Sequence, residues 1–257
     1  MPLVALPDAL PADLRADLRG WFAPEAPGPL IGPHVLLTGR GRLWADRWPA
    51  PRALLAETTD NFALRGDPAA WDPAALAARL RGFVEAPPAY APLLHEICPT
   101  LVVWPRVVYA LAGPPPKPPL PKRARVRALQ PSDLPAAAGL GPEVSWVFKT
   151  WGGLPGALAS GLFWGAWLER RLVSVAGTFF LGAEYEDLGV ATEPAYRGLG
   201  LNTACAAAAC AAVQARGRTP SWNTSTDNPA SIRVAQKLGF RWVRDDCLYV
   251  MGLETLP

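Results

Sequence analysis

The sequence predicts a mixed α/β (α+β) fold, with a mostly antiparallel sheet flanked by helices, and three observations support this class. The chain has 257 residues, of which 50% are hydrophobic and 18% charged, so it can bury a sizeable core. Apolar runs of strand length, separated by turn-forming residues, follow one another in both halves. In the last third, strands alternate with helical segments that carry capping residues.

A proline-rich segment divides the chain. Residues 113–121 have the sequence GPPPKPPLP, which can neither continue a helix nor donate to a central strand. A stiff polyproline II connector is expected there. The division predicts an N-terminal α/β domain at 1–112, a linker at 113–122 and a second domain at 123–257.

The N-terminal half contains short elements and no evident catalytic constellation. Asp72–Gly82 has helical spacing, with Asp72 as the N-cap and Pro73 at the first helical position. Pro105 interrupts an apolar run and predicts two strands there. The expected elements are a helix at Pro11–Trp21, strands at Val35–Thr38, Leu43–Asp46, Ala53–Glu57 and Phe62–Arg65, the helix at Asp72–Gly82, and strands at Leu101–Trp104 and Val107–Leu111.

The C-terminal half has a clearer pattern. Period-2 alternation in one strand puts Glu184 and Glu186 on one face and Asp187 on the other. The expected elements are strands at Arg125–Leu129, Leu162–Glu169, Leu172–Leu181, Glu184–Thr192, Ser221–Ser225 and Arg241–Met251, and helices at Pro131–Ala138 (capped near Ser132), Pro142–Trp151, Leu199–Ala215 and Pro229–Leu238.

Composition and charge exclude several classes of function. The net charge is +3, and the one basic cluster, Lys122–Arg127, lies beside prolines as in a solvated linker, so nucleic acid is excluded as the main partner. With only His34 and His95, a three-histidine zinc site is impossible, and we expect neither histidine to act as a base. The four cysteines include no C-x-x-C pair, so no metal is expected and a reducing compartment is favoured.

The sequence also bears on location. The first 21 residues lack the basic region and apolar stretch of a signal peptide. The longest apolar run, Ala204–Val213, has about half the length of a membrane span. We therefore expect a cytoplasmic protein without a membrane partner.

The strongest candidate ligand site follows the strand that ends at Thr192. A short loop with Arg197, Gly198 and Gly200 leads directly into a long helix. Glycines permit positive φ and close backbone approach, and the first N–H groups of a helix have no internal partner. Together with the helix dipole, these donors suit a pyrophosphate, although the same pattern also occurs in purely structural connections. The spacing differs from that of Rossmann and P-loop motifs.

A second segment strengthens this interpretation. Trp222–Phe240 has the sequence WNTSTDNPASIRVAQKLGF and lies one helix downstream of the loop. The loop Arg197–Asn202 resembles the R/Q-x-x-G-x-G/A acyl-CoA loop of the GNAT N-acetyltransferase superfamily. The second segment resembles the strand–helix motif that follows that loop in the superfamily. The resemblance covers Arg125–Val250 and is closest to the branch that includes zwittermicin-resistance-type acetyltransferases.

The resemblance implies a sheet that splays at the strand ending in Thr192, with acetyl-CoA as co-substrate entering the gap. Backbone groups of Val190 and Thr192 would bond the pantetheine arm, and Asn228 would approach it. From its matching strand-rich pattern, we expect the N-terminal half to extend the sheet or to form a degenerate GNAT-like copy of the same fold, walling the acceptor site. The residues implied to hold the pyrophosphate are Arg197, Gly198, Leu199, Gly200, Leu201 and Asn202.

Two positions depart from the family pattern. Asn202 stands where the loop has Gly or Ala, which is sterically tolerable at the start of a helix. Ala235 replaces the tyrosine that many members use to protonate the departing thiolate. Tyr249 and Tyr185 are the available substitutes. A thiol with a reference pKa of about 8.5 can also leave as the thiolate without help near neutral pH.

Acetylation of an amine also requires removal of a proton, because an amine of pKa about 10.4 is protonated at neutral pH. A carboxylate near the thioester can accept that proton. Glu184 matches the catalytic glutamate of histone-acetylating relatives, whereas Glu186 lies one pleat nearer the expected gap. We favour Glu186 over Glu184 as the base, and a solvated strand end is the structural alternative.

These inferences predict an N-acetyltransferase that moves an acetyl group from acetyl-CoA to a primary amine of a small molecule, directly in a ternary complex and without a metal. Two alternatives stay open: a catalytically silent acyl-CoA-binding sensor or interaction protein, and a longer-chain acyl-CoA N-acyltransferase. Cys205 and Cys210 are expected in the core. The acceptor and the oligomeric state stay open, and five tryptophans are candidates for either core packing or an acceptor pocket: Trp146, Trp151, Trp164, Trp167 and Trp222.

Overall fold

The computed structural model describes residues 3–7 and 10–253. Over these residues the strands are β1 (Val4–Ala5), β2 (Arg42–Ala45), β3 (Ala53–Thr58), β4 (Asn61–Gly66), β5 (Gly82–Glu85), β6 (Val102–Ala110), β7 (Ala124–Ala128), β8 (Phe163–Leu168), β9 (Arg171–Leu181), β10 (Tyr185–Thr192), β11 (Thr219–Ser225) and β12 (Arg241–Met251). The α-helices are α1 (Ala12–Arg19), α2 (Ile31–Thr38), α3 (Pro73–Ala77), α4 (Ala91–Ile97), α5 (Leu134–Ala138), α6 (Pro142–Ser145), α7 (Leu154–Ser160), α8 (Leu201–Ala215) and α9 (Pro229–Lys237). Short 3-10 helices are η1 (Gly20–Phe22), η2 (Pro68–Ala70), η3 (Pro88–Tyr90), η4 (Pro131–Asp133), η5 (Trp146–Trp151) and η6 (Pro194–Tyr196).

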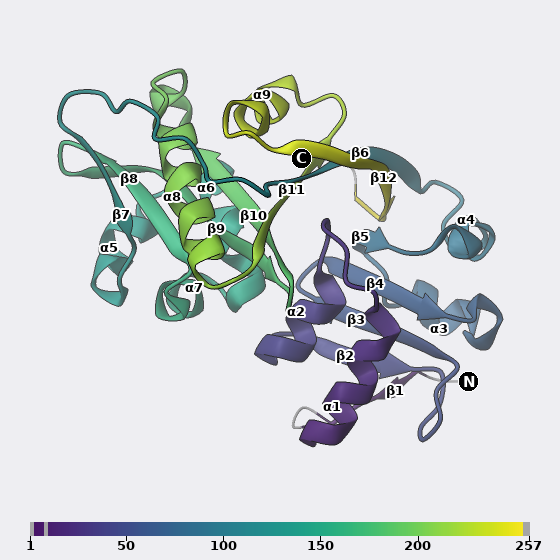
Figure 1. Cartoon of the computed structure of the whole chain (residues 1–257). Coiled ribbons are helices and arrows are strands. Elements are labelled where there is room, and N and C mark those ends of the chain that lie inside the picture. Colours follow the sequence, from purple (N-terminus) through teal and green to yellow (C-terminus); the bar gives the residue numbers. More distant parts are fainter. Residues whose placement is uncertain (1–2, 8–9, 254–257) are drawn as a thin grey trace.

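All strands of the described residues belong to one sheet, in the order β1-β2-β3-β4-β5-β12-β6-β11-β10-β9-β8-β7. Within the described ranges, β4–β5 and β10–β11 are the two pairs that run parallel. Figure 1 shows two lobes, with β6 and β12 running between them. The predicted fold class, a mixed and mostly antiparallel α/β sheet flanked by helices, is confirmed.

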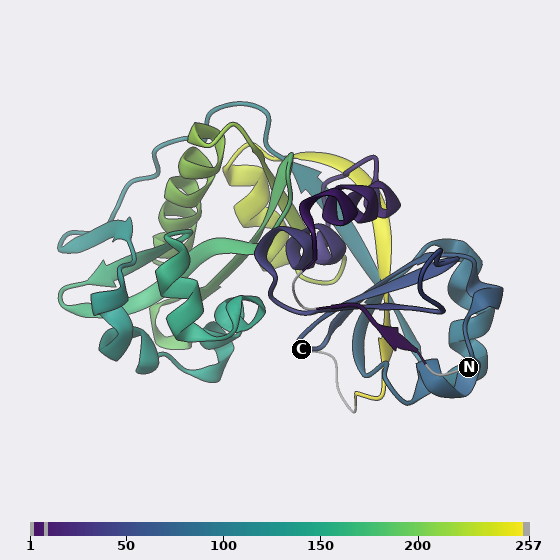
Figure 2. The ribbon, with the colours of Figure 1, turned by 90° about the horizontal axis from the view of Figure 1, so that it is seen from below.

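The two halves repeat one topology and exchange their last strands. In each half, antiparallel strands lead to a parallel pair, then to a helix and a final strand. The final strand of the first half, β6, lies between β11 and β12 of the second. Likewise β12 lies between β5 and β6, and Figure 2 shows it entering the N-terminal lobe. This arrangement fits the expectation that the first half is a second copy of the fold, while the division at residues 112 and 123 stays a prediction.

The expected strand at Val35–Thr38 is wrong, because these residues lie in helix α2. The helix ends at Gly39, which adopts a left-handed φ of +67°. Its apolar residues are buried almost all round, since α2 packs against both β3 and β9. A short apolar run of this kind has no periodicity that separates a helix from a buried strand.

Pro105 does not break the apolar run around it into two strands. β6 continues through this residue, which pairs with Cys247 of β12. Pro105 lies just outside the stretch of β6 that pairs with β11, where the last partner is Arg106. The Thr226 N–H still donates to the Pro105 carbonyl at 3.2 Å, but Pro105 has no N–H to return the bond, so the β6–β11 ladder ends there.

Helix boundaries also differ from the prediction. The Asp72 cap is confirmed, since its Oδ1 accepts from the N–H of Ala74 at 3.0 Å, but the helix ends at Ala77. Gly82 begins strand β5 with φ +134°, where a Cβ would lie 2.2 Å from a backbone oxygen. The cap expected near Ser132 is wrong: the Gln130 N–H donates to Asp133 at 2.8 Å. The expected helix there starts as η4 and continues as α5, and α7 was not predicted.

Four packed layers position the site. One face of the C-terminal strands packs under α8 and α9, where Cys205 and Cys210 are fully buried as expected. The opposite face is covered by α5, α6, η5 and α7. In the N-terminal half, α1 and α2 cover one face and α3 and α4 the other. Within the described residues, no helix has the length and apolar character needed to span a bilayer.

Candidate active site

The sheet opens between β10 and β11. These strands pair only over Tyr185–Asp187 with Thr219–Ser221. Beyond Ser221, β10 stays paired with β9 as far as Thr192, and β11 stays paired with β6 as far as Ser225. The expected splay at this strand is therefore confirmed.

The edge of β10 offers backbone groups to this opening. The Glu193 N–H donates to the Val173 carbonyl at 2.9 Å, so these two residues form a hydrogen-bonded pair. Along an antiparallel ladder such pairs alternate with pairs whose N–H and C=O groups point away from the partner strand. Val190 and Thr192 therefore turn their backbone groups toward the side that β11 has left. This orientation suits an extended ligand that bonds to the strand edge.

The loop after β10 presents a row of free amide groups. Gly198 and Gly200 adopt φ of +78° and +76°, and helix α8 begins at Leu201. Among the described residues, none accepts a hydrogen bond from the N–H groups of residues 198–203. Residues 198–200 are exposed, so no side chain packs the loop shut. Free donors at the N-terminus of a fifteen-residue helix favour an anion.

Of the loop residues named from the sequence, Arg197 is engaged elsewhere. Its Nη2 lies 2.7 Å from Glu143 of α6, and its Nε donates to the Thr192 carbonyl at 3.3 Å. Its backbone N–H donates to Pro194 at 3.3 Å. Arg197 therefore ties the loop to α6, and the free donors begin at Gly198. Leu199 is 46% exposed, whereas Leu201 is buried in the core under α8.

Asn202, the departure from the family loop, fits its position. Its Nδ2 donates to the Thr192 hydroxyl at 3.2 Å, and that hydroxyl lies 2.7 Å from Ser174 Oγ. Its Oδ1 is buried without a hydrogen-bond partner among the described residues. The side chain thus links α8 to the end of β10 and leaves one acceptor atom for a ligand.

Asn228 lies at the end of the other strand that flanks the opening. Its Oδ1 caps α9 by accepting from the Ser231 N–H at 3.0 Å. The residue is exposed. Trp222, three residues before the end of β11, is buried and donates to Ser231 at 3.0 Å. Trp222 is therefore a core residue that braces α9.

Glu186 does not have the surroundings of a base. Its carboxylate is fully buried and accepts from Arg216 at 2.9 and 2.7 Å, from Arg218 at 3.3 Å, and from the Thr178 hydroxyl. Both arginines follow the C-terminal end of α8, remote from the loop at its start. The network occupies both carboxylate oxygens. Glu186 is a buried ion-pair residue in this structure, which corrects the expectation that it faces the acceptor.

The other two catalytic candidates also lie away from the opening. Glu184 is exposed in the turn before β10. Its N–H donates to Glu25 at 2.8 Å, and its carbonyl accepts from Thr219. Tyr249 pairs with Val84 of β5 and is buried in the core of the N-terminal half, because β12 crosses into that lobe. The structure therefore supports neither Glu184 as the base nor Tyr249 as the acid.

Asp187 is the carboxyl group at the opening, and the sequence analysis did not select it. It is the last residue of β10 that pairs with β11, and it is 5% exposed. Ser221 Oγ donates to its Oδ1 at 3.3 Å and accepts from the Gly28 N–H at 2.8 Å. Burial raises the pKa of Asp187 to about 8, against the opposing charge of Arg106. The available sequence clue was a lone acid among apolar strand residues, on the face opposite the two glutamates.

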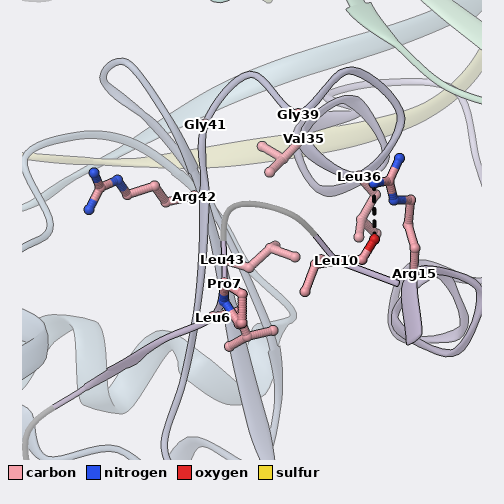
Figure 3. Close-up of a pocket in the computed structure, with 10 residues that line it drawn as sticks. All are labelled: Leu6, Pro7, Leu10, Arg15, Val35, Leu36, Gly39, Gly41, Arg42 and Leu43. Atoms are coloured by element: carbon pink, nitrogen blue, oxygen red, sulfur yellow. Dashed lines mark hydrogen bonds between the residues drawn. The ribbon is translucent and has the colours of Figure 1, made fainter. Parts of the chain in front are cut away.

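The cavity in the N-terminal half lies apart from this site. A cavity of about 30 Å³ lies in the N-terminal half between α1, α2 and β2, lined by Leu6, Leu10, Val35 and Leu43 (Figure 3). It has room for about one water molecule. Among the residues that the structure describes, no group of His, Cys, Asp or Glu is arranged to hold a metal ion.

The chain is similar to known N-acetyltransferases. Residues 148–248 match the family described as GNAT acetyltransferase. Over 215 residues the chain is 41% identical to the "uncharacterized N-acetyltransferase in mutA 5' region" of Streptomyces virginiae, which covers 82% of this chain and 87% of the relative. The protein belongs to the GNAT superfamily of N-acetyltransferases. The resemblance of the loop and of Trp222–Phe240 is thereby confirmed at the level of the superfamily, without singling out the zwittermicin-resistance-type branch.

Solved structures share the fold of this GNAT chain. A GCN5-related N-acetyltransferase-like protein from Streptococcus suis superimposes with a TM-score of 0.73 at 19% identity, covering 93% of this chain and 98% of that one. A tandem GNAT protein from the clavulanic acid biosynthesis pathway gives a TM-score of 0.62 at 12% identity, covering 96% and 97%. The second match agrees with the repeated topology of the two halves.

Proposed function

We propose that this GNAT protein transfers an acetyl group from acetyl-CoA to the primary amine of a small molecule, by direct attack in a ternary complex. The observation that carries the proposal is the opening between β10 and β11, with free amide donors where β10 ends. The N–H groups from Gly198 to Asn202 would hold the diphosphate. The edge of β10 at Val190 and Thr192 would bond the pantetheine arm, and Asn228 would lie beside it.

The donor set of the site fits such a ligand. A diphosphate needs several N–H donors that are exposed and unpaired, which the loop supplies. The unpartnered Oδ1 of Asn202 can accept from an amide N–H of the arm. Bound acetyl-CoA supplies an activated acyl carbon as a thioester.

Asp187 is the residue we assign as proton acceptor. Transfer from an amine of pKa about 10.4 to an ordinary aspartate of pKa about 3.9 costs about 9 kcal/mol. Transfer to a carboxylate of pKa about 8 costs about 3 kcal/mol, so burial of Asp187 makes it the better base. The amine loses a proton to Asp187, its nitrogen bonds to the thioester carbon, and the carbon–sulfur bond breaks to release the CoA thiolate.

No tyrosine is needed to explain departure of the thiolate. Ala235 is fully buried, in the core cluster that also contains Trp222 and Leu238. A thiolate whose conjugate acid has a pKa of about 8.5 leaves readily near neutral pH. The rate should therefore depend on the base more than on an acid.

Two measurements test the proposal. Acetyl-CoA at 100 times its dissociation constant should stabilise the protein by about 2.7 kcal/mol, visible as a rise in melting temperature. Release of free thiol from acetyl-CoA in the presence of a panel of primary amines should then identify acceptors. Absence of any thermal shift with saturating acetyl-CoA or CoA would overturn the proposal.

A silent acyl-CoA sensor is the second candidate, favoured by the engagement of Glu186 with two arginines and by the alanine at position 235. The same assays separate the two functions. A sensor would give the thermal shift without thiol release from any amine. Preference for a longer acyl-CoA in the thiol assay would instead support the longer-chain acyltransferase.

A further inference from the structure

The sheet face opposite α8 carries polar side chains beside the opening. The core under α8 takes Leu188 from β10, Trp222 from β11 and Val107 from β6. Strand alternation turns Asn223 and Arg106 to the other face, which we call the far face. Asp187 lies on this face too, so the proposed base and these groups share one side of the sheet.

Arg106 is held rigidly on the far face. Its Nε donates to Asn223 Oδ1 at 2.9 Å, and its Nη2 donates to the Asn223 carbonyl at 3.1 Å. The guanidinium lies over the Trp104 ring, with Cζ 4.4 Å from the ring centroid. Asn223 follows Ser221 by two residues, about 7 Å of strand. The guanidinium therefore sits close to the point where the opening begins.

Three carboxylates lie near Arg106, since the charges of Asp187, Asp246 and Asp227 all act to raise its pKa, and Asp246 is its cross-strand neighbour on β12. Among the described residues Arg106 forms no ion pair, and its Nη1 forms no hydrogen bond. Nearby arginines differ, since Arg65 lies 2.7 Å from Glu85 and Arg244 lies 2.7 Å from Asp246. Burial lowers the pKa of Arg106 to about 10, which leaves it cationic at neutral pH and partly stripped of water. A desolvated cation of this kind is stabilised by an anion that binds beside it.

Aromatic side chains from both halves continue the surface around the guanidinium. Trp104 contacts Phe83 of β5, with ring centroids 5.8 Å apart. Lys149 Nζ lies 5.5 Å from the centre of the Phe83 ring and 6.0 Å from that of Phe179. Phe179 packs beside Gly189 of β10, where an added Cβ would lie 3.2 Å from the Phe179 Cβ. An aromatic wall thus extends from the guanidinium to the strand that flanks the opening, with the ion pair of Lys149 and Asp60 between Phe83 and Phe179.

We propose that Arg106 binds the carboxylate of the acceptor, and that the acceptor is an amino acid with an aromatic or branched apolar side chain. This inference rests on the proposed function and names its substrate class. The side chain of the amino acid lies on the aromatic wall. The α-amine is bonded to the same carbon as the carboxylate, so it is held near Asp187, to which it gives its proton as the N–C bond to the acetyl group forms.

Matched acceptors that differ only in the carboxylate test this proposal. Phenylalanine is compared with 2-phenylethylamine, leucine with 3-methylbutylamine, and tryptophan with tryptamine, each with acetyl-CoA. We expect kcat/KM to be about 10- to 100-fold higher for the amino acid of at least one pair, as for a hydrogen bond to a charged group. The Arg106→Gln variant should remove this preference, so that the amino acid and the amine of each pair give similar kcat/KM, and Arg106→Lys should restore part of it.

Arg125→Gln is the control variant, because Arg125 is an exposed arginine on the edge strand β7. It should leave the preference unchanged. Calorimetric titration of the enzyme–CoA complex with the same amino acids gives a readout that needs no turnover, and Arg106→Gln should abolish the binding.

The outcomes separate this inference from the proposed function. The amino acid assignment would be overturned, while acetyl transfer stands, if the amine without a carboxylate is the better acceptor in all three pairs. It would also be overturned if Arg106→Gln lowers kcat/KM equally for both members of each pair. Failure of wild type and CoA to bind any of the amino acids would overturn it as well. The acetyl-CoA thermal shift, measured on each variant, reports folding and the donor site, and its absence in wild type would refute the proposed function itself.

Discussion

Substitution of Glu186 by Gln separates the structural role of this residue from a catalytic one. The change removes the negative charge but keeps the side-chain volume. It leaves Arg216 and Arg218, whose side chains are 27% and 28% exposed, facing each other without a shared carboxylate. Removal of one partner of a buried ion pair costs about 3–5 kcal/mol. Because both arginines reach solvent, we expect the lower end, about 3 kcal/mol.

For a chain of this length, about 3 kcal/mol corresponds to a fall in melting temperature of about 6–12 °C. Scanning calorimetry measures this fall, and the thiol-release assay at 20 °C, normalised to folded enzyme, measures activity. We expect kcat/KM of Glu186→Gln to stay within threefold of wild type, with an unchanged pH profile. A variant that keeps its melting temperature and loses 100-fold or more in kcat would refute the reasoning and return Glu186 to the role of base.

Three further predictions test the base, the loop and the contact between the halves. Asp187→Asn should lower kcat by about 10²–10⁴-fold. Wild-type activity should rise with pH, with the midpoint of the rise near the raised pKa of about 8, because the carboxyl group ionises there. A flat wild-type profile through this pH range would contradict the assignment. Gly200→Val forces a branched residue into φ +76°, and calorimetry should show at least tenfold weaker acetyl-CoA binding. Gly217→Val, at the same φ past the other end of α8, should leave this affinity unchanged. Equal losses of affinity in both variants would show that backbone strain alone is responsible. Burial lowers the pKa of His34 to about 4, so as pH falls the unfolded chain takes up a proton at this residue before the folded protein does. The free energy of unfolding should therefore fall by about 3 kcal/mol between pH 6.5 and pH 4. In denaturant titrations, His34→Gln should lose this part of the pH dependence.

The position of His34 explains why its role could not be predicted. It is fully buried on α2, with Nδ1 accepting from the Leu181 N–H at 3.1 Å and Nε2 lying 3.0 Å from the Thr150 carbonyl. Both partners lie more than 100 residues away along the chain. The sequence predicted a surface or core residue at this position, and the structure places it in the core, but the contact between the halves depends on how α2 packs on β9.

The parts of the site that the sequence predicted are local in the chain. The loop from Arg197 to Asn202 joins one strand to the next helix, so its glycines and free amides follow from neighbouring residues. The Asn228 cap is local in the same way. The opening of the sheet followed from the family resemblance rather than from any pattern in the strands themselves.

The parts that could not be predicted depend on contacts between distant residues. Alternation placed Glu186 and Asp187 on opposite faces, but it could not show that α8 ends with Arg216 over one face. The crossing of β12 into the other lobe removes Tyr249 from the opening, and nothing near Tyr249 in the sequence indicates this. Arg106, which we propose binds the acceptor, lies in the half without an evident catalytic constellation, and it lies near the opening only because β6 inserts beside β11.

Hydrogen–deuterium exchange of the loop amides tests the central claim most directly. In the free protein, the amides of residues 198–203 are exposed or unpaired and should exchange rapidly. Saturating CoA should slow exchange there and along residues 188–192, while the turn at Gly217 stays unchanged. Slow exchange of these amides without ligand, or protection by CoA elsewhere in the chain only, would contradict the account.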